Sequence, residues 1–263
     1  MADAVETEGA EAPPPAGETL SPRWPLWLSN FALGGAILVV IYALGGLTLA
    51  RYDMIAKIDG FRAFMQTMIP AAVVGGVAIL AIVFAVWRKS AGKVKAGIAV
   101  VLSATLLLVM YTQVMLPAGK VPPIHDISTD LGDMPQFTAL DVDNPVSTGP
   151  FSEEEWRAFH EGAYSDIGPI VIDKAPAAVL ADAQALAEAR GWEIAGYDAE
   201  AGRLEATATA GYLRFYDDVV VEVTPVTDGS TRVDMRSVSR VGVSDLGYNA
   251  ARIREFLADL QAA

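Results

Sequence analysis

The sequence has 263 residues, of which 52% are hydrophobic, and it carries a formal net charge of −13. A strongly acidic chain repels phosphate backbones, which argues against nucleic-acid binding. The chain contains no cysteine, which excludes disulfides and thiolate metal ligands. The charge is unevenly divided: residues 1–116 hold 8 Lys+Arg and 7 Asp+Glu, whereas residues 117–263 hold 11 and 25, a net charge of −14. This division predicts an apolar N-terminal part and an acidic C-terminal domain.

Residues 1–22 are rich in alanine, glutamate and proline and show no apolar periodicity. Such a composition buries too little apolar surface to order a chain, and we expect a disordered tail. The first residues are acidic, whereas a cleaved signal peptide begins with basic residues. We therefore do not predict a signal peptide in this segment.

Residues 23–116 contain three long stretches without a charged residue, at Trp24–Ala50, Thr67–Trp87 and Ala96–Leu116. About 20 apolar residues, at about 1.5 Å each, cross the hydrocarbon core of a bilayer, which is about 30 Å thick. Tryptophan at the ends of such stretches is typical of the membrane–water interface. We predict three transmembrane helices in this region.

The basic residues near these stretches predict an orientation, because cytoplasmic loops carry more Lys and Arg. Placing the dense basic turn between the second and third stretches in the cytoplasm leaves five basic residues inside and four outside. The five are Arg23, Arg88, Lys89, Lys93 and Lys95, and the four are Arg51, Lys57, Arg62 and Lys120. We expect a multi-pass protein of the bacterial inner membrane, with a cytoplasmic N-terminus and a periplasmic C-terminal domain.

Residues 117–150 contain six prolines and are predicted to form an extended strap between the membrane and the domain. Proline interrupts helices and is excluded from central strands. The six are Pro117, Pro122, Pro123, Pro135, Pro145 and Pro150.

Residues 151–263 show the pattern of a soluble α+β domain. A short helix is predicted over Phe151–Phe159 with Ser152 as its N-cap, and a longer helix over Pro176–Arg190. Four strand patterns and a closing amphipathic helix follow. They are Trp192–Tyr197, Arg203–Tyr212, Asp217–Val226, Thr231–Ser239 and the helix Asp245–Gln261. This order predicts an antiparallel sheet of about four strands with flanking helices.

The strap contains an unusual string at Val121–Asp130, in which His125 and Asp126 are adjacent and Asp130 follows closely. One interpretation is a site for a catalytic base. The alternative is that these side chains cap backbone groups where the strap crosses the domain. The spacing matches no zinc motif, and His160 is the one other histidine in the sequence, so we predict no metal site.

A second unusual string leads from the last strand into the last helix. Its candidate ligand-binding residues are Arg236, Ser239, Arg240, Asp245, Asn249 and Arg252. Three arginines near a helix N-terminus are typical of a pocket for a carboxylate or a phosphate. The alternative is internal pairing of these arginines with the many Asp and Glu residues. Ser244 or Asp245 is expected to cap the helix, and the amide of Asn249 must find partners on its apolar face.

The two strings are expected to meet. Arg236 and Arg240 share one face of the last strand because side chains alternate along a strand. An Asp126 carboxylate against a guanidinium would form a bidentate pair. We expect the effects of replacing Asp126 and Arg240 to be non-additive.

Together the two strings resemble a bacterial and plastid family known as domain of unknown function 1499. The resemblance rests on Val121–Asp130, Asp133–Phe137, Asp217-Asp218 and Arg236–Ile253, and Met134 stands where the family tends to have proline. The resemblance implies that both strings belong to one domain, and it implies no activity.

Two hypotheses follow from these patterns. The first is a non-catalytic, membrane-tethered module that binds a ligand or a partner on the extracytoplasmic side. The second is a hydrolase-type enzyme using His125 and Asp126 with an arginine-lined anion pocket. An enzyme needs His125 near Arg236 or Arg240 in a concave pocket, whereas a binding module pairs these groups internally. No cofactor is expected, and the expected partners are the lipid bilayer and other membrane or periplasmic proteins.

Overall fold

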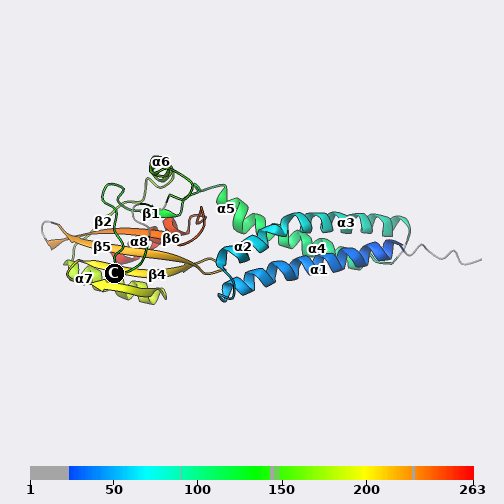
Figure 1. Ribbon diagram of the computed structural model, residues 1–263, viewed down its shortest axis with the longest axis horizontal. Coiled ribbons are helices and arrows are strands. Elements are labelled where there is room, and N and C mark those ends of the chain that lie inside the picture. The colour runs from blue at the N-terminus through cyan, green and yellow to red at the C-terminus, as the bar shows by residue number, and fades with distance from the viewer. Residues whose placement is uncertain (1–23, 90, 143–145, 147, 227–228) are drawn as a thin grey trace, which may run out of the picture.

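The computed structural model describes residues 24–263 except 90, 143–145, 147 and 227–228. The expected tail at 1–22 and Pro145 lie outside the described residues. Three stretches of helix are long and apolar enough to cross a membrane, and they have 28, 31 and 26 residues. They form a bundle at one end of the molecule (Figure 1). The helices are α1 (Trp24–Arg51), α2 (Lys57–Gln66), α3 (Met68–Trp87), α4 (Lys93–Met110), the π-helical turn η1 (Tyr111–Met115) and α5 (Leu116–Ala118).

The segment between the first two uncharged stretches contains the helix α2. Lys57, the first residue of α2, is buried, and its ammonium group donates to the Ala50 carbonyl at 2.9 Å and pairs with Asp53 at 2.8 Å. The charges of this segment therefore satisfy the carbonyls at the end of α1. Glycines allow the two helices to approach closely, since a Cβ on Gly60 would lie 2.2 Å from the Ala50 Cβ.

The C-terminal domain is built on an antiparallel sheet of six strands in the order β1-β6-β5-β4-β3, with β2 also paired to β6. The prediction of about four strands was too low, because β1 and β2 have three residues each and are too short to show alternation. β1 lies within the predicted strap, between its prolines. The strands are β1 (Asp126–Ser128), β2 (Ile170–Ile172), β3 (Glu193–Asp198), β4 (Arg203–Ala210), β5 (Phe215–Pro225) and β6 (Thr231–Ser239).

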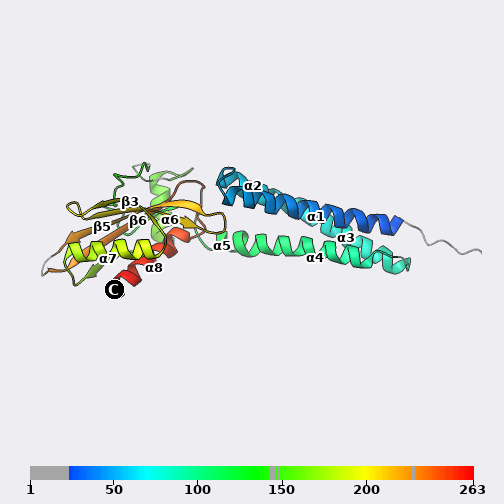
Figure 2. The ribbon, with the colours of Figure 1, turned by 90° about the horizontal axis from the view of Figure 1, so that it is seen from below.

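Two helices cover the apolar face of this sheet, α7 (Pro176–Ala189) and α8 (Tyr248–Ala262) (Figure 2). The core between them contains Leu180, Val221, Met235 and Phe256. A third helix, α6 (Glu153–Ala163), begins with the predicted cap: Ser152 Oγ accepts from the Glu155 amide, and the Glu155 carboxylate accepts from the Ser152 amide. The last helix begins three residues later than predicted, because Gly247 adopts a left-handed conformation with φ 88°.

The opposite face of the sheet carries charged residues beside Val220 and Val238, and residues 131–142 cross it. The charged sheet residues bind the backbone of this segment, which forms no ladder of its own. Glu205 of β4 accepts hydrogen bonds of 2.7–3.1 Å from the amides of Thr138, Ala139 and Leu140. Burial alone would raise the pKa of Glu205, but these bonds and that from the Thr138 hydroxyl outweigh it and hold the pKa below its usual range.

The turn between β4 and β5 contacts the helical bundle. The guanidinium group of Arg51, the last residue of α1, donates to the Tyr212 carbonyl and lies over the Tyr212 ring. The ring of Phe215 lies 6.4 Å from that of Phe61 on α2. These contacts fix the sheet domain against the corner formed by α1 and α2.

The loop between β6 and α8 makes a second contact with the bundle. Leu246 packs against the cluster of bundle residues that contains Phe64, Met110 and Val114. Leu246 has a φ of 56°, a left-handed conformation that costs a branched residue about 1–2 kcal/mol. The apolar contact with the bundle offsets this strain.

Candidate functional site

The candidate residues of the two strings gather around the end of β6, but they divide between the two faces of the sheet. Arg236 reaches the face crossed by residues 131–142 and binds Asp126 there. Ser239, Asn249 and Arg252 belong to the face covered by α8. β6 therefore separates the candidate residues into two polar clusters.

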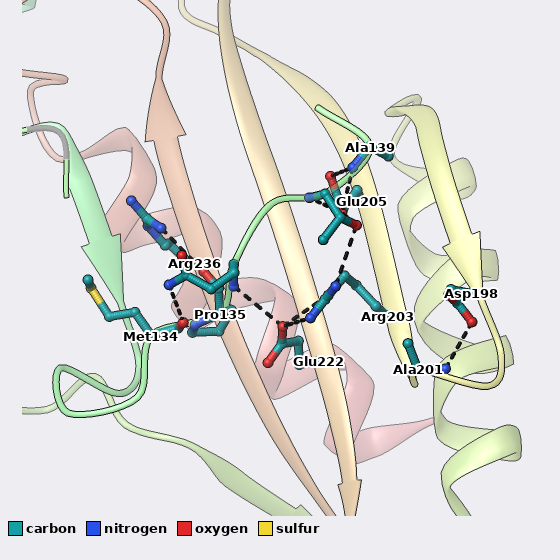
Figure 3. Close-up of polar contacts among 11 residues, drawn as sticks. Met134, Pro135, Ala139, Asp198, Ala201, Arg203, Glu205, Glu222 and Arg236 are labelled. Atoms are coloured by element: carbon teal, nitrogen blue, oxygen red, sulfur yellow. Dashed lines mark hydrogen bonds and ion pairs between the residues drawn. The ribbon is translucent and has the colours of Figure 1, made fainter. Parts of the chain in front are cut away.

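Asp126 and Arg236 form the centre of the first cluster. Two hydrogen bonds join them, from Nε to Oδ1 at 3.0 Å and from Nη2 to Oδ2 at 2.8 Å, and both side chains are 0% exposed. Arg236 also donates to the Pro135 carbonyl at 3.3 Å, and its guanidinium lies 5.4 Å from the centre of the Phe137 ring. Figure 3 shows Arg236 directed at the segment that contains Pro135. The pair thus lies beneath the crossing segment.

Arg240 shares this face with Arg236, as predicted, but the expected coupling to Asp126 is not what the structure shows. Arg240 forms two bonds of 2.8 Å with Asp218 of β5, which is buried, and one of 2.9 Å with the Thr207 hydroxyl. Its side chain is 45% exposed. Asp218 and Asp126 both lie opposite Val238, on the two sides of β6, and Arg240 turns toward β5 whereas Arg236 turns toward β1.

Asp130 forms a smaller charged group at the end of β1. Its carboxylate accepts from the amides of Gly132 and Asp133 at 2.8 and 3.0 Å and pairs with Arg232 at 2.6 Å. The Asp133 amide is the largest influence, and with Gly132 and Arg232 it lowers the pKa of Asp130 against the opposing effect of burial. Asp130 therefore closes a turn, as the capping interpretation expected.

The second cluster is centred on Asn249, which is 0% exposed. Its amide nitrogen donates to the His125 carbonyl at 2.8 Å and to Ser239 Oγ at 3.0 Å, and its oxygen accepts from Ser237 Oγ at 2.7 Å. Arg252 donates to the Asn249 oxygen and to Ser237 Oγ. Both the nitrogen and the oxygen of the Asn249 side-chain amide therefore have hydrogen-bond partners, as its buried position requires.

Two buried carboxylates complete the second cluster. Asp217 binds Arg252 at 2.6 Å, and Asp245 accepts from the amides of Gly247 at 2.9 Å and Asn249 at 2.5 Å. Burial raises the pKa of both carboxylates, against the bonds and charges that stabilise them. The N-cap of the last helix is Gly247 and not Ser244 or Asp245 as expected, and Asp245 binds the Asn249 amide from outside the helix.

His125 joins the two clusters through its backbone. Its carbonyl accepts from the Asn249 amide group and from the Ser239 amide at 3.1 Å. Its side chain is buried. Through these contacts, His125 links the start of β1 to α8.

Sequence reasoning missed the residues of α6 that hold the outer edge of β1. Trp156 Nε1 donates to the Asp126 carbonyl at 3.0 Å, and His160 Nε2 accepts from the Ser128 amide at 3.2 Å. Burial lowers the pKa of His160, and the nearby charge of Asp126 acts in the opposite direction. The signal available was the spacing of four residues, which places Trp156 and His160 on one helical face.

The arrangement of these groups is that of structural pairs. The three arginines expected to line an anion pocket each bind a different aspartate: Asp126, Asp218 and Asp217. Within the described part of the chain, no group of three or more His, Asp or Glu side chains is placed to hold a metal ion. These polar contacts fix β1, β6, α6 and α8 to one another.

A family model with the description "Protein of unknown function (DUF1499)" matches residues 126–260. The match runs from β1 to α8 and so contains both polar clusters and the whole sheet. It covers about half of the chain and leaves out the apolar helices. No curated protein matches the chain.

Proposed function

The chain belongs to the DUF1499 family, whose function is unknown, and from this premise we propose that it is a membrane-anchored, non-catalytic module that binds a ligand or a partner on the extracytoplasmic side. The three apolar helices support the anchor. The five basic residues against four support the orientation, with the N-terminus in the cytoplasm of a bacterium and the domain in the periplasm. The bilayer and other membrane or periplasmic proteins are the proposed partners.

One observation carries the non-catalytic part of this proposal. The Asp126–Arg236 pair at the centre of the first string is 0% exposed on both sides and lies beneath residues 131–142. A catalytic acid, base or anion-binding arginine must reach its substrate, and a pair covered by its own chain does not. The charged groups of the two strings therefore serve to hold the domain together, and binding falls to its surface.

The hydrolase hypothesis requires different behaviour from His125 and Asp126. Asp126 would have to leave Arg236, and breaking a buried pair costs about 3–5 kcal/mol. His125 would have to present its imidazole to a substrate, although the side chain is buried. The geometry therefore favours the binding module over the hydrolase.

Two experiments on the purified full-length chain in detergent test the proposal. The first screens ligands by thermal unfolding, and the second measures turnover of model esters and phosphates. A ligand at about 100 times its Kd is expected to stabilise the domain by about 2.7 kcal/mol. We expect no turnover that depends on His125. Turnover that His125→Ala abolishes without lowering the unfolding midpoint would show that the domain is an enzyme and contradict the proposal.

A further inference from the structure

The end of the sheet domain that faces the helical bundle carries most of the domain's exposed apolar side chains. Seven large hydrophobic side chains are exposed in the described residues after 118, and four belong to this end. They are Tyr212 (59%), Val241 (42%), Val243 (48%) and Tyr248 (47%). We call residues 120, 211–214 and 240–248 the bundle-facing end. Water-exposed apolar groups gathered in one place mark a surface that something else covers.

The same end carries basic groups that lack acidic partners. Of the 11 Lys and Arg residues after position 116, nine form ion pairs with carboxylates. The other two, Lys120 and Arg214, are exposed and form no ion pair with any residue that the structure describes, and the charge of Arg214 lowers the pKa of Asp53 from a distance. In a domain with a net charge of −14, the basic groups without an ion pair in the described part of the chain lie at this end. The positive charge of the bundle-facing end is complementary to the negative charge of phosphate.

Contacts with the bundle place this end at the level where the apolar helices stop. Tyr212 is bonded to Arg51, the last residue of α1, and Leu246 packs among Phe64 and Val114 of the bundle. Figures 1 and 2 show the β4–β5 turn and the β6–α8 loop at the end nearest α2 and α5. Tyrosine and basic side chains concentrate at this depth in membrane proteins, because one part of each side chain is apolar and the other is wet.

We propose that the bundle-facing end is a lipid-contact surface that seats Tyr212, Val241, Val243 and Tyr248 in the interfacial layer of the bilayer, with Lys120 and Arg214 against glycerophospholipid phosphates. This inference rests on the membrane anchor of the proposed function. The surface is continuous with the helices that the bilayer would surround, and its charge matches phosphate, which favours lipid over a second protein. The buried Asp245–Asn249 cluster then has a role: it shapes the loop that carries Val241 and Val243 to the membrane and Leu246 to the bundle.

The absence of cysteine allows a direct test on the full-length chain. Val243→Cys and Tyr212→Cys are labelled with a fluorophore and reconstituted in nanodiscs of phosphatidylcholine and phosphatidylglycerol. A nitroxide on the lipid headgroup or in the acyl chain is the lipid-borne quencher, and iodide is the aqueous one. Val171→Cys on β2, 57% exposed at the far end of the sheet, is the matched control. Leu38→Cys, 68% exposed on α1, reports on the anchor itself.

We expect the labels at positions 243 and 212 to lose fluorescence to the headgroup nitroxide, and the label at 171 to lose it to iodide alone. If the label at 38 is quenched by acyl-chain nitroxide while the label at 243 behaves like that at 171, the inference is overturned and the anchor stands. Shielding of position 243 from both quenchers would mean that protein covers this end, which also overturns the inference. A label at 38 that iodide quenches, and acyl-chain nitroxide does not, overturns the anchor and the inference together.

Discussion

Asp126 and Arg236 are both fully buried, and removing two charges from water is costly unless geometry compensates. Here the pair is bidentate, and the remaining donor capacity of Arg236 goes to the Pro135 carbonyl and the Phe137 ring. Each charge is therefore satisfied only while the other is present. The pair holds β1, β6 and the crossing segment in one arrangement.

We predict strong coupling between Asp126 and Arg236 in a double-mutant cycle with Asp126→Asn and Arg236→Met. Each single replacement leaves one buried charge unpaired and is expected to cost about 3–5 kcal/mol, whereas the double variant should lose much less than the sum. The free energy of unfolding, followed by tryptophan fluorescence, measures this. Arg240→Ala is the matched control: with Asp126→Asn its effect should add within about 0.3–0.5 kcal/mol. Coupling of Asp126 to Arg240 as strong as to Arg236 would contradict the pairing seen here.

His160 is predicted to make the fold sensitive to mild acid. Burial lowers its folded pKa below the unfolded value of about 6.5, so the unfolded state binds more protons as pH falls from that value toward the folded pKa. Its contribution to stability is therefore present above about pH 6.5 and is lost as pH falls below it. Protonation also removes the acceptor for the Ser128 amide.

The buried carboxylates Asp217 and Asp245 act with the opposite sign. Because their pKa values are raised, the folded state binds more protons above the unfolded value, and they favour folding as pH falls. The His160→Gln variant separates the two effects, since glutamine retains an acceptor that does not titrate. Lowering the pH from 7 to 5 should reduce the unfolding midpoint of the native chain more than that of the variant. Equal pH dependence in both would remove His160 as the cause.

Among the structural elements, the crossing segment 131–142 explains why the sheet is charged on one face. This segment pairs with no strand that the structure describes, so its amides need other acceptors. Glu205 supplies them to Thr138, Ala139 and Leu140, and Arg203 and Glu222 form a second pair beside it at 2.7 Å (Figure 3). The alternation of polar and apolar residues along these strands is typical of a sheet with one solvent-exposed face, but another part of the chain covers that face.

The α1–α2 contact gives a prediction at the level of helices. Gly60→Ala would place a Cβ 2.2 Å from the Ala50 Cβ and 2.7 Å from the Gly46 carbonyl oxygen. Overpacking of this kind costs about 1–3 kcal/mol, and the thermal midpoint of the full chain in detergent should fall. Gly45→Ala is the control, since its Cβ would meet nothing within 4 Å and alanine is the better helix former. A Gly60→Ala midpoint at or above that of Gly45→Ala would show that the helices separate freely.

For the whole molecule, the proposed orientation rests on three helices that are long and apolar enough to cross a membrane and on a basic turn at residues 88–95. We predict that alkaline phosphatase fused to the C-terminus is active in bacterial cells, because the proposed orientation places the domain in the periplasm. Phosphatase fused after Gly92 should be silent, since that turn is expected in the cytoplasm. A silent C-terminal phosphatase, with an active cytoplasmic reporter at the same site, would reverse the proposed topology.

Local patterns in the sequence were sufficient to predict much of the fold. Uncharged stretches placed the three long helices, and alternation placed β3 to β6, because burial of an apolar face leaves its period in the sequence. Two of its strings also carried the resemblance to the family that the chain belongs to. The sequence predicted that Asp126 would meet an arginine, since both strings hold groups that need partners.

Only the tertiary structure decided which arginine it meets and what that implies. Asp126 and Asp218 lie opposite Val238 on the two sides of β6, so each is two residues in register from both arginines. Arg236 turns toward β1 and Arg240 turns toward β5, and these contacts between distant strands leave no local pattern in the sequence. The strands β1 and β2, of three residues each, exist only because β6 is there to pair with them. Burial likewise depends on what crosses above a residue: the chain beyond β1 covers the charged face, and this converts an apparent anion site into a structural pair.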